Sequence, residues 1–183
     1  MRFTTLMIAL AIVAATLTGC ETEDTMDEMA NVAAAQPENP IGTVLISMKK
    51  SDFKSAVANE VELQLLASGY AVVREETDDL VQDAVTEPHE ESGVSGLKSL
   101  NLYDAVIMLE AARGSVFRRD ARKLYDVMKG DERLVVLLTT KKSQTDWEPE
   151  MEGLDAVTAA SNMADVKTVA DKIVQKTMAA LGE

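Results

Sequence analysis

Two hydroxyl groups and two ammonium groups directly follow the first long apolar run after the N-terminal leader. They belong to Ser47, Lys49, Lys50 and Ser51. Hydroxyls, ammonium groups and the free N–H groups of a helix N-terminus all bind anions, so a strand-to-helix loop with this composition is a candidate phosphate site. A plain connection between two packed elements has a similar composition. Met48 separates the serines as well, and no glycine in this loop allows close backbone approach to an anion.

Further cations follow two later apolar runs, and they are Arg113, Arg118, Arg119, Lys141 and Lys142. If the runs are parallel strands, their carboxyl ends share one rim, where Lys49, Lys50, Arg113 and Lys141 would converge. Such a cluster can hold a small anionic ligand such as a phosphate or a carboxylate. The alternative is solvated charge, balanced by the acids Asp52, Glu110, Asp146 and Glu148.

Other side chains with chemical potential are few. Trp147 lies in a long polar segment, where it can stack on a flat ligand or pack against its own loop. His89 is the single histidine and stands beside Pro88 in an acidic segment. A histidine-ligated metal site or a Ser-His triad would therefore need an unusual arrangement, and we assign neither a metal site nor a catalytic residue.

The first twenty residues have the features of an export signal. Arg2 precedes the apolar run 6–15, which is shorter than the roughly 20 residues needed to cross a bilayer. The sequence Leu17-Thr-Gly-Cys20 then resembles the lipobox of bacterial lipoproteins. The resemblance implies a signal peptide over residues 1–19, lipid such as palmitate on Cys20, and a membrane anchor outside the cytoplasm. In a diderm bacterium this would be the periplasmic side or the outer membrane; an ordinary secretory leader is the alternative.

Composition limits the partners of the exported chain. Removing the leader takes away Arg2 and no acid, so the formal net charge moves from −13 to −14. We expect no nucleic-acid partner because its binding requires clustered cations, and an anionic membrane surface would not attract this body. Residues 20–40 are acidic, contain two prolines and lack aromatic residues, which predicts a flexible tether ahead of a domain over residues 41–183. Cys20 is the only cysteine, so no disulfide forms within the chain.

The domain alternates between strand and helix patterns. Apolar runs predict strands over 43–48, 70–73, 103–109 and 134–138, and a short edge strand over 154–157. Helical spacing of apolar residues occurs over 53–66, 117–128 and 166–181, with a weaker signal near 80–85. Gly69 and Gly130 end the first and third helices. This order predicts a doubly wound parallel sheet of five strands with helices on both faces.

The opening strand and loop, Tyr103-Asp-Ala-Val-Ile-Met-Leu109 and Val135-Val-Leu-Leu-Thr-Thr140 together resemble the flavodoxin-like family. That resemblance implies the strand order 2-1-3-4-5 and a ligand crevice beyond the carboxyl ends of strands one and three. It also implies FMN as a cofactor, bound near Ser47, Ser51 and Trp147. The chain departs from the family pattern at Met48, Lys49 and Lys50, which replace small residues of the phosphate loop.

A second short motif is Asp155-Ala-Val-Thr-Ala-Ala-Ser161, which resembles the sequence of exported domains that carry FMN covalently. The resemblance makes Ser161 the attachment residue, although Ala159 replaces a glycine and Ser161 replaces a threonine. The alternative is that Ser161 caps the final helix, with Asp165 in the first turn. The sequence thus favours a lipid-anchored binding or accessory protein. The second hypothesis is an FMN-dependent redox or electron-transfer protein.

Overall fold

The computed structural model of the chain describes residues 35–82, 100–112, 117–141 and 154–183. The predicted signal peptide, Cys20 and the tether up to residue 34 lie outside this part. The same holds for His89, Arg113, Lys142 and Trp147. The hypotheses for these residues remain predictions.

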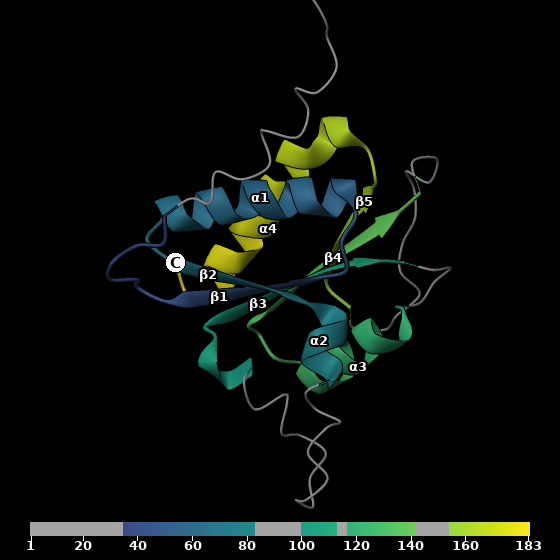
Figure 1. Cartoon of the computed structure of the whole chain (residues 1–183), viewed down its shortest axis with the longest axis horizontal. Helices are drawn as coiled ribbons and strands as arrows, with labels where there is room; N and C mark the ends of the chain where they lie inside the picture. Colours follow the sequence, from purple (N-terminus) through teal and green to yellow (C-terminus); the bar gives the residue numbers. More distant parts are fainter. Residues whose placement is uncertain (1–34, 83–99, 113–116, 142–153) are drawn as a thin grey trace, which may run out of the picture. The chain divides into compact units, whose positions relative to one another are not determined.

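Five parallel strands form one sheet (Figure 1). They are β1 (Thr43–Met48), β2 (Ala71–Glu76), β3 (Ala105–Ala111), β4 (Leu134–Thr140) and β5 (Ala156–Ala160). Their order is β2-β1-β3-β4-β5, and every neighbouring pair is parallel. The predicted doubly wound sheet and its strand order are therefore confirmed.

Helices cover both faces of the sheet (Figure 1). On one face lie α1 (Asp52–Ala67) and α4 (Val166–Ala180); on the other lie α2 (Thr77–Gln82) and α3 (Arg119–Met128). Successive side chains of a strand point to opposite faces. Ile46 consequently packs in the core beneath α1 and α4, whereas Leu45 packs in the core beneath α2 and α3. No helix in the described ranges is both long enough and apolar enough to span a membrane.

Local signals fix the ends of α1. The hydroxyl of Ser51 caps the helix by accepting a hydrogen bond from the backbone N–H of Lys54 at 3.4 Å. After the helix, Gly69 has a φ of +90°, which strains any residue with a side chain. Both bounds agree with the sequence pattern.

Four strands differ from their predicted bounds. β4 continues to Thr140, beyond its predicted end at residue 138. β2 continues to Glu76 and β3 to Ala111, although acidic and small residues there have the composition of loops. Pairing with a neighbouring backbone overrides this composition, because Met48 is in register with Glu76 and Ala111 with Thr139. β5 starts and ends later than predicted, over Ala156–Ala160. Glu110 consequently belongs to a central strand and not to a loop.

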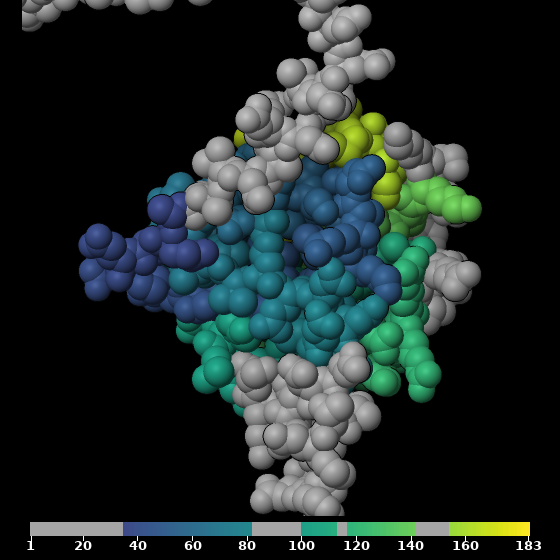
Figure 2. Space-filling view, in the orientation of Figure 1, coloured from purple at the N-terminus to yellow at the C-terminus, as the bar shows by residue number. Residues whose placement is uncertain are grey.

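Residues 35–40 include a contact with the edge strand. The side-chain amide of Gln36 donates to the carbonyl of Val72 at 2.9 Å and accepts from its N–H at 3.0 Å. These two groups of Val72 face away from β1, because the N–H of the preceding residue, Ala71, bonds to Gly42. Residues of α1 and β2 make up much of the face seen in Figure 2. Contact with the domain thus begins before residue 41.

Candidate anion-binding site at the carboxyl edge of the sheet

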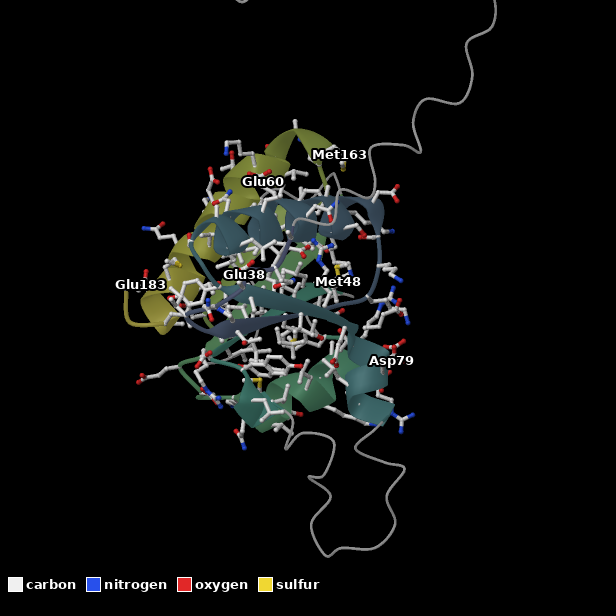
Figure 3. The ribbon with its side chains drawn as sticks, turned by 60° about the vertical axis from the view of Figure 1, so that its left-hand side comes forward. Glu38, Met48, Glu60, Asp79, Met163 and Glu183 are labelled. Carbon is white, nitrogen blue, oxygen red and sulfur yellow. The ribbon has the colours of Figure 1, made fainter. Side chains whose placement is uncertain are left out.

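The carboxyl ends of β1 and β3 lie side by side in the centre of the sheet. The chain leaves β1 for a helix on one face and leaves β3 for a helix on the other face. This reversal marks the position where doubly wound proteins bind their ligands. Figure 3 shows Met48 at the end of β1 and Asp79 on α2 on the same side of the domain.

A chain of buried hydrogen bonds lies at this edge. The hydroxyl oxygens of Ser47 and Thr77 are 2.9 Å apart, and Thr77 Oγ1 donates to Glu110 Oε1 at 2.5 Å. Because the single hydroxyl proton of Thr77 goes to Glu110, Ser47 must donate to Thr77. The three residues are at most 1% exposed. This series of hydrogen bonds therefore ends at the buried carboxylate of Glu110, which accepts a hydrogen bond from Thr77 at the start of α2.

The side chain of Lys54 joins the same region. Lys54 lies in the first turn of α1 and is only 3% exposed. Within the described part of the chain, its ammonium makes no hydrogen bond or ion pair. Burial lowers the pKa of Lys54; the charge of Glu110 opposes this effect, and the charges of Arg118 and Lys49 add to it. The charges of Lys54 and Glu110 thus attract each other without a hydrogen bond or an ion pair between the two residues.

The two predicted loop lysines do have partners. Lys49 pairs with Asp78 at 2.6 Å, and Lys50 pairs with Glu76 at 2.9 Å. These hydrogen bonds are the main reason that the pKa of each lysine lies above its usual value. Acids from the end of β2 and the start of α2 therefore neutralise the cations that follow β1.

The remaining predicted residues lie elsewhere along the edge. Ser161 follows β5, where its hydroxyl donates to the carbonyl of Thr140 at 2.8 Å. Asn162 and not Ser161 caps the short 3-10 helix Met163–Asp165 that precedes α4, so the capping alternative for Ser161 was wrong. Two strands, β3 and β4, separate β5 from β1, so Ser161 does not join the Lys54 region through adjacent strands. Lys141 is exposed after β4.

Sequence reasoning missed Lys54 and Thr77 and treated Glu110 as solvated. A signal was present for Lys54, because it shares helical spacing with the buried residues Ala58 and Val61. Glu110 follows Met108 at the two-residue spacing of a strand, so it shares the buried face of that residue. A charged residue at a position that otherwise belongs to the apolar face of its helix or strand is the pattern that identifies Lys54 and Glu110 as buried.

The loop after β1 does not fit the phosphate of FMN, which the fold family implies. Ser47 donates its hydroxyl proton to Thr77, Ser51 caps α1, and both lysines are paired with acids. A phosphate loop instead offers free hydroxyls and close backbone N–H groups to its ligand.

Comparison with known proteins identifies the fold. No protein-family model matches the chain, and no relative is found among curated protein sequences. Among solved structures, oxidised flavodoxin 2 from Bacillus cereus has a TM-score of 0.51 at 14% identity, over 75% of this chain and 99% of that chain. The flavodiiron core of Flv1 from Synechocystis sp. PCC6803 has a TM-score of 0.52 at 11% identity, over 78% of this chain. The match spans 36% of the flavodiiron chain. The protein therefore has a flavodoxin-like fold.

Proposed function

We propose that this protein is an exported lipoprotein whose flavodoxin-like domain serves as a non-enzymatic binding or accessory module. The lipobox-like Leu17-Thr-Gly-Cys20 supports an anchor on Cys20 and a location outside the cytoplasm. The strongly negative body cannot supply membrane attachment by itself, so the lipid must do so.

One observation carries the choice of a binding role over a flavin role. The side chains that would wrap a flavin phosphate after β1 are bonded within the protein, with Lys49 held by Asp78 and Lys50 by Glu76. Before the loop could enclose a phosphate, both ion pairs and the hydrogen bond between Ser47 and Thr77 would have to break. This cost favours a domain that does not hold FMN there.

The visible absorption of the purified full chain tests this choice. We expect a colourless protein, even after incubation with excess FMN and removal of the unbound flavin. Bacillus cereus flavodoxin 2, expressed and treated identically, is the positive control.

A yellow sample would overturn the binding role in favour of the FMN-dependent alternative. Colour lost on denaturation would place flavin in a noncovalent site. Colour retained on denaturation would mean covalent flavin, and Ser161→Ala would then abolish it if Ser161 is the attachment residue.

A further inference from the structure

The two edges of the sheet differ in how they are protected. At the β2 edge, the side-chain amide of Gln36 bonds to both outward backbone groups of Val72, and the strand ends in the charged residues 74–76. Caps and charged side chains of this kind keep an edge strand from pairing with another chain. The β5 edge consists of Ala156-Val-Thr-Ala-Ala160 and has no charged residue or proline. Among the residues that the structure describes, only the β2 edge is therefore protected in this way.

The outer backbone groups of β5 are available for pairing. The N–H of Ser161 bonds to the carbonyl of Thr140 on β4 at 3.0 Å. Since the backbone groups of successive strand residues point in alternate directions, those of Ala156, Thr158 and Ala160 face away from β4. The carbonyl of Ala160 accepts a hydrogen bond in the turn that follows the strand. No hydrogen bond within the described ranges reaches the N–H or the carbonyl of Thr158, which is exposed at the middle of β5.

The β5 edge is complementary to a second copy of itself. In an antiparallel pair about a two-fold axis at Thr158, this residue lies opposite Thr158 of the second copy, and Ala156 lies opposite Ala160. Small side chains let the strands approach each other, and two opposed threonines stabilise an antiparallel pair. The arrangement also places no like charges opposite each other along the five residues of the strand.

Charges beyond the two ends of β5 are complementary as well. Asp155 precedes the strand, its side chain is 85% exposed, and it pairs with Lys176 at 2.5 Å. Lys141 is exposed at the opposite end of the strand, because Thr140 is in register with Ala160. Antiparallel pairing brings Asp155 of one copy to the end where Lys141 lies in the other copy, twice by symmetry. These opposite charges offset part of the repulsion between two negative chains.

We propose that two copies of this chain associate through their β5 edges into one continuous sheet, with five strands from each copy. The partner is a second copy because the small residues and the terminal charges of this edge are complementary to themselves. The inference goes beyond the proposed binding role, since it concerns a surface away from both the anchor and the carboxyl ends of β1 and β3. On a membrane, confinement of anchored chains would raise their effective concentration and favour the pair.

The mass of the full chain, solubilised in mild detergent and measured by light scattering, tests the proposal. With bound detergent subtracted, the wild type should approach twice the mass of one chain as its concentration rises. Thr158→Lys should return the mass to that of a single chain, because like charges directly opposite each other destabilise a strand pair. Leu63→Lys introduces the same charge on α1, where Leu63 is 50% exposed, and should keep the doubled mass.

A proline tests the backbone pairing itself. The N–H of Thr158 faces away from β4, so Thr158→Pro removes no hydrogen bond of the folded chain but removes a donor that the second strand needs. The variant should have the mass of a single chain and the far-UV circular dichroism spectrum of the wild type. Thr158→Ser keeps the N–H and should keep the doubled mass.

A wild type with the mass of a single chain at every concentration would overturn the proposal and leave this edge to a strand from another protein. A doubled mass in Thr158→Lys or in folded Thr158→Pro would also overturn it, as would a single mass in Leu63→Lys. If Thr158→Pro does not fold, the two lysine variants decide. Flavin absorption is measured separately, so a colourless monomer would overturn this inference and leave the proposed function intact.

Discussion

At the scale of single residues, Thr77 is the central member of the buried hydrogen-bond series, with Ser47 on one side and Glu110 on the other. Thr77→Val removes the hydroxyl at nearly constant volume and leaves a buried donor and a buried acceptor without partners. We expect the free energy of unfolding to fall by about 1–3 kcal/mol. Ser47→Ala removes only the terminal donor and should cost less. Urea denaturation of both variants measures the difference. Equal stability of Thr77→Val and wild type would contradict the hydrogen bonds assigned to Thr77.

Tyr70 provides a residue-scale prediction of pH dependence. Its hydroxyl donates to Glu183 at 2.7 Å, and this bond, together with burial and the Glu183 charge, raises the pKa of Tyr70 to about 12. An unfolded tyrosine titrates near pH 10. The folded state therefore holds the proton more tightly, so this contribution to stability is complete below about pH 10 and is lost towards about pH 12.

Tyr70→Phe isolates that contribution. At about pH 8 the variant should be less stable than wild type by roughly 1 kcal/mol, the usual worth of one hydrogen bond. The gap should shrink as the pH rises from about 10 towards 12, because only the wild type has a phenol at position 70, which ionises in the unfolded state at lower pH than in the folded state. Tyr103 also has a raised pKa, mainly through burial, but it titrates in both proteins and cancels in the difference. A gap that stayed constant with pH would argue against the Tyr70 bond.

At the scale of elements, β3 and β4 form the centre of the core beneath α2 and α3. Val106 is fully buried on β3 and Val136 is nearly so on β4. Replacing either with Asp buries an unpaired charge, which costs several kcal/mol and should unfold a domain of ordinary stability. Val127→Asp is the matched control, because Val127 is 51% exposed on α3, and it should cost no more than about 1 kcal/mol. Circular dichroism melts compare the three, and similar melting of all would refute the assigned core.

Elements encoded by local patterns were predictable, and the candidate site was not. The bounds of β1 and α1 follow from an apolar run, the cap at Ser51 and the stop at Gly69. The proximity of Lys54 and Glu110 instead arises from the pairing of β1 with β3, which brings distant segments together. Loop composition likewise predicted that Lys49 and Lys50 contact a ligand. The sequence alone does not show that Glu76 at the end of β2 and Asp78 on α2 lie beside these lysines and pair with them.

At the scale of the whole molecule, the proposed anchor gives a prediction independent of the domain. If Cys20 carries lipid, the wild type expressed in bacteria should incorporate labelled palmitate, and Cys20→Ser should incorporate none because a serine offers no thiol for lipid attachment. Thr18→Ser changes a neighbouring residue and should keep the label. The domain should remain folded in all three, since Cys20 and Thr18 precede the described residues that form the core.

Membrane fractionation alone is a weaker test, because an unprocessed leader can hold a chain at the membrane without any lipid. The mass of the purified chain separates these cases: the lipoprotein should begin at Cys20 and carry acyl chains. The lipid is the required anchor because a body with a formal charge of −14 after leader removal is repelled by anionic lipids and each buried methylene contributes about 0.8 kcal/mol. A labelled Cys20→Ser variant, or an unlabelled wild type, would leave an ordinary secretory leader as the better account of residues 1–19.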